Sequence, residues 1–444
     1  MSEKWEKIFN KTATELFELL DSEEVLTLNF SGEETNFVRL NNGFVRQATN
    51  VEQGKITLEL VRGKKKASLT SSLSLDFEES LAKLKEDLNS LKKEVVILED
   101  DPYTVTPTNG GQSRTIVTGE LPTAEKFISL IKDETDGLDL AGYLSMGTIL
   151  RGNSNSLGQN HWFETTNFNF DYSLYTAKEK AIKGEYAGNF FDKEDLYASL
   201  AESKAALRVM DIEQIELEPG NYRVYLTPSA LNEIAGLLGW HALSGGAYKK
   251  GECPLADLYE GKKSFSEKIS MKENFGLGLS PKFNEWGEVS EEEVVLISKG
   301  KLKTLLVSKE TEKEFGLTSN KATGFEGPRS LELEEGELKR EDILESLKDG
   351  IYISNLHYLN WSDKNNGRIT GMTRFGCLKV EDGKVVGPIK DLRFDETLYN
   401  IFGSECESVT NFSEMIMSNG TYDQRDLGGN KLPGLLLKSF KFTL

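Results

Sequence analysis

The chain has 444 residues, with 53 lysines and arginines against 72 aspartates and glutamates, and so carries a formal net charge of −19. A surface this acidic repels a phosphate backbone, which disfavours direct contact with nucleic acid. No stretch approaches the roughly 18 uninterrupted apolar residues of a membrane span, so we expect no membrane contact. The length allows more than one domain, each with its own core.

The N-terminal segment has an amphipathic pattern. Its apolar residues share one helical stripe with charged residues between them: Trp5, Ile8, Phe9, Ala13, Phe17 and Leu20. This differs from the continuous apolar region of a signal peptide, so we expect a cytoplasmic protein. The three cysteines, Cys253, Cys377 and Cys406, are widely spaced. They predict reduced, mostly buried thiols and no disulfide framework or CxxC zinc knuckle.

The N-terminal half predicts a sheet covered by helices. Short β-prone runs occupy residues 25–30, 36–40, 44–50, 55–61 and 66–71, and turns such as Asn41-Asn42-Gly43 and Gln53-Gly54 separate them. Apolar residues at helical spacing then predict helices over residues 77–91, 123–132 and 192–210, the first capped by Asp76. The spacing indicates an antiparallel meander.

A change of pattern after Met210, with Pro219-Gly220 following, indicates a domain boundary. We therefore predict an α+β protein with a two-layer N-terminal domain at residues 1–211, built on an antiparallel sheet. A β-rich α+β domain follows at residues 212–444, with a helix at 340–348. Its strands are expected at residues 291–298, 301–307, 350–359, 376–380, 384–386 and 435–442.

The C-terminal half also predicts a helix at residues 228–243, which begins with Pro228 in its first turn and ends at Ser244-Gly245-Gly246. A zinc hydrolase that uses a helix needs two histidine nitrogens on one metal, a third ligand and a carboxylate near the bound water. Here the helix holds only His241. Glu233 lies eight residues earlier, about 12 Å along an α-helical axis, so these two cannot share a metal.

Other ligands and chemistries stay open or find no support. Glu252 and Cys253 are conceivable partners of His241, but their spacing matches no recognised ligand set. The alternatives are a metal site at His241 or a structural or groove-lining histidine. The G-x-S-x-G, Walker A and G-x-G-x-x-G motifs are absent from the sequence. Composition does not exclude a Ser-His-Asp triad, although none of the three histidines sits beside a recognisable nucleophile.

These features together resemble the TldD/PmbA family, whose zinc-binding members carry an H-E-x-x-x-H helix followed by a glycine and a basic residue. Leu243–Gly246 and Lys249–Gly251 match that following turn. In this register His241 takes the place of the second histidine. Gly236 and Leu237 stand where the first histidine and the glutamate would be.

Further matches follow in order along the chain. The segment Phe283-Asn284-Glu285-Trp286-Gly287 is similar to the family's F-D-D-E-G turn, with departures at Asn284 and Trp286. Thr370-Gly371 is kept from a later strand block, although Met372 replaces the usual aspartate. Metal-binding members also take a cysteine ligand near the C-terminus, and no cysteine follows Cys406.

The resemblance implies a metal-free subunit of the TldE/PmbA branch, without catalytic or cofactor-binding residues of its own. Such a subunit would pair with a zinc-bearing TldD-type subunit, or form a homodimer, in a protease that degrades short or unfolded peptides in an enclosed cavity. His241, Glu285, Trp286 and Thr370 are expected to line that cavity. Two alternatives are an autonomous peptidase around His241, Glu285 and Cys253, and a peptide-binding or regulatory homodimer without catalysis.

Overall fold

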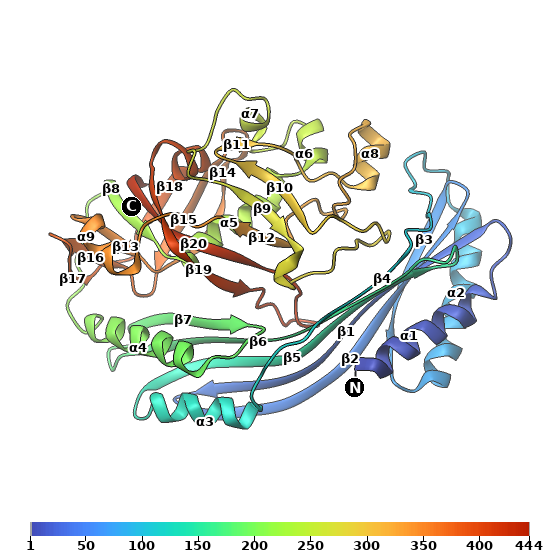
Figure 1. Ribbon diagram of the computed structural model, residues 1–444, viewed down its shortest axis with the longest axis horizontal. Helices are drawn as coiled ribbons and strands as arrows, with labels where there is room; N and C mark the ends of the chain where they lie inside the picture. The colour runs from blue at the N-terminus through green and yellow to red at the C-terminus, as the bar shows by residue number, and fades with distance from the viewer. Residues whose placement is uncertain (1, 444) are drawn as a thin grey trace.

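The computed structural model describes residues 2–443, which form two sheets joined face to face (Figure 1). A 7-stranded sheet in the N-terminal half has the order β3-β2-β1-β5-β6-β4, with β7 also paired to β6. A 13-stranded sheet in the C-terminal half lies against one face of it. The predicted α+β class is confirmed.

The N-terminal sheet is built from unusually long strands, and four helices accompany it. The strands are β1 (Glu24–Asn41), β2 (Phe44–Arg62), β3 (Lys65–Leu73), β4 (Gln112–Val117), β5 (Asp139–Asn155), β6 (Asn160–Tyr175) and β7 (Ala181–Gly188). The helices are α1 (Ser2–Phe17), α2 (Phe77–Ile97), α3 (Ala124–Glu134) and α4 (Lys193–Val209).

The meander has fewer turns than the sequence predicts. The runs at 25–30 and 36–40 belong to the single strand β1, and those at 44–50 and 55–61 to β2. The turn at Asn42-Gly43 is present, with both residues at positive φ. Gln53-Gly54, however, lies inside β2, where a Cβ on Gly54 would come within 2.6 Å of the Trp5 ring. This glycine serves close packing, not a turn.

Helices cover the opposite face of this sheet at its two ends (Figure 1). Helices α1 and α2 pack on one end, in a cluster that contains Trp5, Phe9 and Phe30. Helices α3 and α4 cover the other end through Phe127 and Leu200. The predicted helices are confirmed, and Asp76, Thr123 and Asp192 accept hydrogen bonds from the first turns of α2, α3 and α4 as caps.

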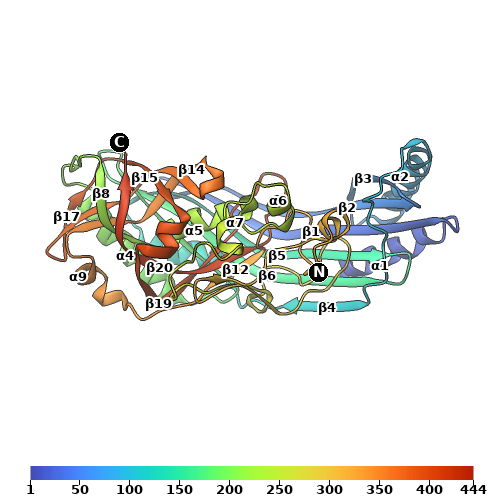
Figure 2. The same ribbon diagram turned by 90° about the horizontal axis from the view of Figure 1, so that it is seen from above.

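The C-terminal sheet is made mostly of short strands around one long hairpin. Its strands are β8 (Gly220–Leu226), β9 (Met271–Asn274), β10 (Glu293–Ser298), β11 (Lys301–Leu302), β12 (Ser330–Leu333), β13 (Gly350–Ile353), β14 (Asn355–Asp363), β15 (Arg368–Arg374), β16 (Leu378–Glu381), β17 (Lys384–Pro388), β18 (Arg393–Thr397), β19 (Cys406–Met417) and β20 (Gly429–Phe442). The strand expected at 301–307 is therefore much shorter. Seen from above, the C-terminal body covers only part of the long N-terminal strands (Figure 2).

Short helices and helical turns complete the C-terminal half. The α-helices are α5 (Pro228–Leu237), α6 (Gly245–Lys249), α7 (Ala256–Tyr259), α8 (Lys309–Phe315) and α9 (Ile343–Leu347). The turns are η1 (Leu238–Ala242), η2 (Phe275–Leu277), η3 (Arg340–Asp342), η4 (Lys364–Asn366) and η5 (Asn400–Ser404). Among residues 2–443, no helix has the length and apolarity needed to cross a membrane.

Candidate functional site

Helix α5 presents one buried and one open face. Thr227 caps its start and Pro228 occupies its first turn, where the missing N–H costs no hydrogen bond. Leu231 and Ile234 are fully buried in the C-terminal core. The open face carries Glu233 and Gly236. A side chain at position 236 would meet no atom within 4 Å.

The helix expected over residues 228–243 is interrupted, which corrects the sequence prediction. Regular α-helix ends at Leu237, and residues 238–242 form a wider turn with a break inside it. Trp240 has φ −88° and ψ 69°, and His241 is left-handed at φ 73°. Glycines at 236 and 239 weaken the helix at this point, because glycine loses more backbone entropy than other residues on entering a helix.

The break turns His241 toward the η4 turn between β14 and β15. Its side chain is 49% exposed. The Lys364 ammonium donates a hydrogen bond to Nδ1 of His241 at 2.5 Å. The Glu252 carboxylate lies 3.8 Å from the same nitrogen and 3.4 Å from Lys364 Nζ. The three side chains form an exposed polar cluster.

This arrangement does not fit a zinc ion. An ammonium group occupies the lone pair that a metal would need on His241 Nδ1. Gly236 offers no ligand, and Leu237 is a buried core residue, 4% exposed. Among residues 2–443, no group of three or more histidine, cysteine, aspartate or glutamate side chains is placed to hold a metal ion.

Cys253 does not join the His241 cluster. Its thiol is buried and donates a hydrogen bond to the carbonyl oxygen of Ala242 at 3.3 Å. Burial raises the pKa of this thiol to about 11, so the thiol is protonated and unreactive near neutral pH. Of the two conceivable partners, only Glu252 approaches His241.

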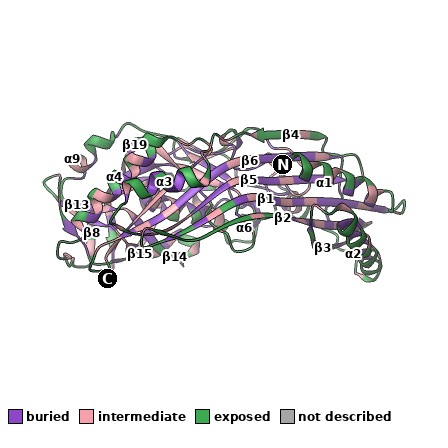
Figure 3. Cartoon of the chain, turned by 90° about the horizontal axis from the view of Figure 1, so that it is seen from below, coloured by how far each residue is buried: buried purple, intermediate pink, exposed green. Residues whose placement is uncertain are grey.

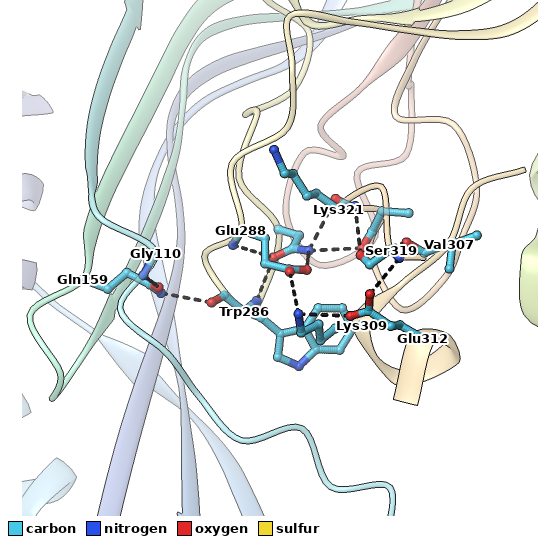
Figure 4. Close-up of polar contacts among 11 residues, drawn as sticks. Gly110, Gln159, Trp286, Glu288, Val307, Lys309, Glu312, Ser319 and Lys321 are labelled. Carbon is cyan, nitrogen blue, oxygen red and sulfur yellow. Dashed lines mark hydrogen bonds and ion pairs between the residues drawn. The ribbon is translucent and has the colours of Figure 1, made fainter. Parts of the chain in front are cut away.

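Glu285 and Trp286 lie in a turn that joins the two sheets. The Glu285 carbonyl accepts hydrogen bonds from the side chains of Asn29 at 3.2 Å and Asn153 at 2.8 Å. The Trp286 carbonyl accepts one from Gln159 at 3.1 Å, as Figure 4 shows. The turn therefore docks by its backbone on the ends of β1, β5 and β6.

A loop at residues 322–327 connects this turn with η1. The Glu285 carboxylate accepts a hydrogen bond from the Gly324 N–H at 2.7 Å. Burial raises the pKa of Glu285, although this hydrogen bond opposes the shift. The next residue, Phe325, is 64% exposed and lies beside Gly239 of η1. Glu285 and Trp286 are thus near η1 in space, with this loop between them.

Thr370 belongs to a different environment. It lies in β15, where its hydroxyl donates to the Phe394 carbonyl at 2.8 Å and accepts from Arg393 Nε at 3.3 Å. Both partners are on the neighbouring strand β18. The described contacts do not bring Thr370 together with His241, Glu285 or Trp286.

A polar cavity lies beside α5, and the sequence did not predict it. It has a volume of about 320 Å³ and lies between β7, α5 and the β19–β20 connection. Lys183, Glu185, Asn232 and Glu233 are among its lining residues. A signal was present in α5, since Ser229, Asn232 and Glu233 follow each other at helical spacing on one face. The β7 residues carry no such signal.

The cavity holds carboxylates in an environment that favours their protonated forms. Burial, reinforced by nearby Asp171, raises the pKa of Glu185 to about 8. Burial also raises the pKa of Glu233. Lys183 forms an ion pair with Asp171 at 2.9 Å, so one cation stands among several acids. The carboxyl and amide side chains that line the cavity can therefore donate and accept hydrogen bonds.

Comparison with known proteins identifies the family. Residues 219–444 match the family model of the PmbA/TldA metallopeptidase C-terminal domain, which covers half of the chain. The chain belongs to the TldD/PmbA family. No protein of curated function matches it in sequence.

Three crystal structures share the fold of this TldD/PmbA-family chain. TldE from Thermococcus kodakarensis has 16% sequence identity and a TM-score of 0.77, over 98% of this chain and 100% of that one. A Thermotoga maritima MSB8 protein, described as a candidate modulator of a DNA gyrase, has 16% identity and a TM-score of 0.74, over 99% and 100%. A Bacteroides thetaiotaomicron VPI-5482 protein, described in the same terms, has 14% identity and a TM-score of 0.76, over 99% and 98%.

Proposed function

We propose that this chain is a non-catalytic, TldE/PmbA-like subunit of a cytoplasmic TldD-type zinc metalloprotease that degrades or processes short or unfolded peptides. Its role is to supply cavity wall and subunit interface, while the partner subunit supplies the zinc ion. Family membership supports the link to metallopeptidases. The lack of zinc ligands in the α5–η1 segment supports the non-catalytic role.

The observation that carries this proposal is the loss of zinc chemistry at the motif position. Gly236 and Leu237 occupy the positions where zinc-binding members of the family have the first histidine ligand and the general-base glutamate. The Lys364 ammonium donates a hydrogen bond to Nδ1 of His241. A zinc-activated water needs several protein ligands on the metal and a nearby base. None of these groups is assembled around η1 in the part of the chain that the structure describes.

Side chains beside α5 support a peptide-binding role for the cavity wall. Trp240 is 50% exposed and Phe325 is 64% exposed, so both offer apolar surface near η1. The polar cavity with Asn232 and Glu233 opens along the same helix. A peptide lying along α5 could therefore make apolar contacts near one end and hydrogen bonds near the other.

The test mixes the purified chain with a TldD-type subunit that has the complete H-E-x-x-x-H helix. Size-exclusion chromatography measures the complex, elemental analysis measures zinc, and a fluorogenic unfolded peptide reports cleavage. We expect a stable complex with zinc only in the partner, and no cleavage by this chain alone. His241→Ala should leave the zinc content of the complex unchanged, because His241 is not a ligand.

The autonomous peptidase is the competing hypothesis, and the geometry disfavours it. Cys253 is turned to Ala242 and the Glu285 carboxylate to Gly324, whereas His241 contacts Lys364 and Glu252. Cys253, Glu285 and His241 therefore each contact different residues and do not contact one another. If the chain alone cleaves peptide and loses that activity with a chelator or in His241→Ala, the non-catalytic proposal is wrong.

A further inference from the structure

The polar cavity beside α5 lies between the two halves of the chain. Strand β7 forms its wall on the N-terminal side, and α5 and the β19–β20 connection form its wall on the C-terminal side. Strand β7 pairs with β6, most of whose residues are buried and are coloured purple in Figure 3. Water therefore screens charges in this wall less than it would at an open surface. The volume of about 320 Å³ is at the lower end of the ~300–1,000 Å³ typical of small-molecule sites.

The cavity carries more negative than positive charge. Among residues 2–443, its lining has the carboxyl groups of Glu185, Glu233 and Asp426 and one ammonium group, that of Lys183. Lys183 is already paired with Asp171, 2.9 Å away. No side-chain hydrogen bond or ion pair joins the carboxylate of Glu233 or Asp426 to another residue that the structure describes. The lining therefore has acidic groups without a cationic partner.

A buried amide in the lining also lacks a partner. Asn355, at the start of β14, is 9% exposed, and its Oδ1 atom accepts no hydrogen bond from the described part of the chain. Its Nδ2 group donates none to those residues either. A buried amide without partners costs free energy, so a ligand that offers both donors and acceptors would stabilise it. This observation is independent of the acidic groups.

These groups suit neither a metal ion nor an anion. Among residues 2–443, no three histidine, cysteine, aspartate or glutamate side chains lie close enough together to hold a metal ion. The carboxylates of Glu233 and Asp426 would repel an anion. An ammonium group has three N–H donors that need not share one acceptor, so separate carboxylates and an amide oxygen can each accept one. Spacing and charge thus both select an organic cation.

We propose that the cavity beside α5 binds the primary ammonium group of a short peptide, with the carboxylates of Glu185 and Glu233 and the amide of Asn355 around it. This inference rests on the peptide-binding role proposed above for α5, and it names the group that the cavity recognises. Asn232 accepts a hydrogen bond from Asn430 Nδ2 at 2.7 Å, which leaves its own Nδ2 available to donate. That N–H₂ group can bind a backbone carbonyl of the peptide.

Proton release is an expected sign of this binding. Burial raises the pKa of Glu185 to about 8, and Asp171 and Glu414 raise it further, whereas Lys183 opposes the shift. Burial also raises the pKa of Glu233. A cation beside these two carboxyl groups favours their ionised forms. Binding of the ammonium group near pH 7 should therefore release protons, and the binding heat should change with the ionisation enthalpy of the buffer.

Calorimetric titration of the purified chain with matched peptides tests the recognition. The probes are trialanine amide with a free amino terminus and N-acetyl-trialanine amide, which differ at the amino terminus alone. We expect acetylation to weaken binding by about tenfold or more, because it removes charge-assisted hydrogen bonds. A third probe, Nα-acetyl-lysine amide, carries the ammonium group on a side chain. Its affinity relative to that of trialanine amide identifies which ammonium group of a peptide the cavity takes.

Isosteric variants locate the site. Glu185→Gln and Glu233→Gln should each weaken the binding of trialanine amide by about tenfold. Burial already favours a neutral carboxyl group at position 185, and position 233 is on the open face of α5, so both variants should fold. Thermal unfolding followed by circular dichroism checks this. Glu335→Gln removes the same charge from an exposed position outside the cavity, and it should bind like the unmodified chain.

Three outcomes would overturn the inference: equal binding of the free and acetylated peptides, binding that both glutamine variants leave unchanged, and no binding of any ammonium probe. These titrations use this chain alone and are therefore separate from the test of subunit pairing. A chain that binds trialanine amide but forms no complex with a zinc subunit refutes only the subunit role. A chain that forms the complex but binds no ammonium probe refutes only the ammonium site.

Discussion

At the scale of single residues, Glu326 is the buried charge that organises the segment after η1. Its carboxylate accepts hydrogen bonds from the Ser244 hydroxyl at 2.6 Å and the N–H groups of Gly246 at 2.8 Å and Ser308 at 2.7 Å. Ser244 and Ser308 are the caps of α6 and α8. Burial alone would raise the pKa of Glu326, but these hydrogen bonds lower it below the ordinary 4.5.

We predict that Glu326→Gln lowers the free energy of unfolding by about 1–3 kcal/mol at pH 7, because the new amide N–H₂ group cannot accept from these donors. A carboxyl with a lowered pKa stabilises the fold above its unfolded pKa and loses that effect as pH falls through the folded pKa. The difference in unfolding free energy between Glu326→Gln and the unmodified chain should therefore become smaller below pH 4.5. Urea denaturation across pH measures it.

The exposed Glu335→Gln is the matched control and should leave stability nearly unchanged. If the difference in unfolding free energy between Glu326→Gln and the unmodified chain stays constant down to pH 3, the ionised carboxylate does not stabilise the fold, and the role given to Glu326 is wrong.

At the scale of elements, two glycines have opposite roles. Gly54 sits inside β2, and a Cβ there would lie 2.6 Å from Trp5 and 2.8 Å from Phe30. This close approach lets α1 rest on the sheet. Gly236 sits inside α5 on its open face, where an added methyl group would have no atom within 4 Å. Only the first glycine is required by packing.

We predict that Gly54→Ala destabilises the chain by about 1–3 kcal/mol, because overpacking forces the ring of Trp5 or Phe30 to move. Gly236→Ala should instead raise stability by up to about 1 kcal/mol, since alanine favours the helix and meets no obstacle. Thermal unfolding of the two variants measures the contrast. Equal effects of the same sign would show that packing does not distinguish these positions.

At the scale of the whole molecule, a polar seam couples the two sheets. Asn153 is fully buried and donates to Asn29 Oδ1 at 2.7 Å and to the Glu285 carbonyl at 2.8 Å. Farther along the seam, the Arg425 N–H donates to the carboxylate of Glu33 at 3.3 Å. The turn at residues 283–287 and the β19–β20 connection are thus held on the N-terminal sheet by hydrogen bonds that involve both backbone groups and side chains.

We predict that Asn153→Ala lowers stability by about 1–3 kcal/mol, because it removes the buried side chain's hydrogen bonds to Asn29, the Glu285 carbonyl and Gln159. Weaker coupling should also separate the unfolding of the two sheets into distinct transitions. Urea unfolding followed by both tryptophan fluorescence and circular dichroism would detect the separation. Asn411→Ala, at an exposed position, is the control and should keep the single transition of the unmodified chain.

Sequence alone was sufficient for features set by local chemistry. The cap at Asp76 and the helices that begin near residues 77, 123 and 192 depend on residues a few positions apart. The α+β class and the family also followed from patterns along the chain. The buried, free state of the cysteines followed from their number and spacing.

Only the tertiary structure decided features that depend on distant contacts. The sequence predicts a turn at Gly54, but in the structure this glycine lies inside β2 and makes room for the Trp5 ring. The sequence also predicts one continuous helix at 228–243, but in the structure the helix breaks at η1 and His241 contacts Lys364. The cavity beside α5 needs β7 from the other half of the chain. Within residues 2–443, residues 44–53 of β2 have no strand paired on their outer side because β3 ends opposite Gly54. Local propensity acts between sequence neighbours, whereas these features arise from packing between segments far apart in the chain.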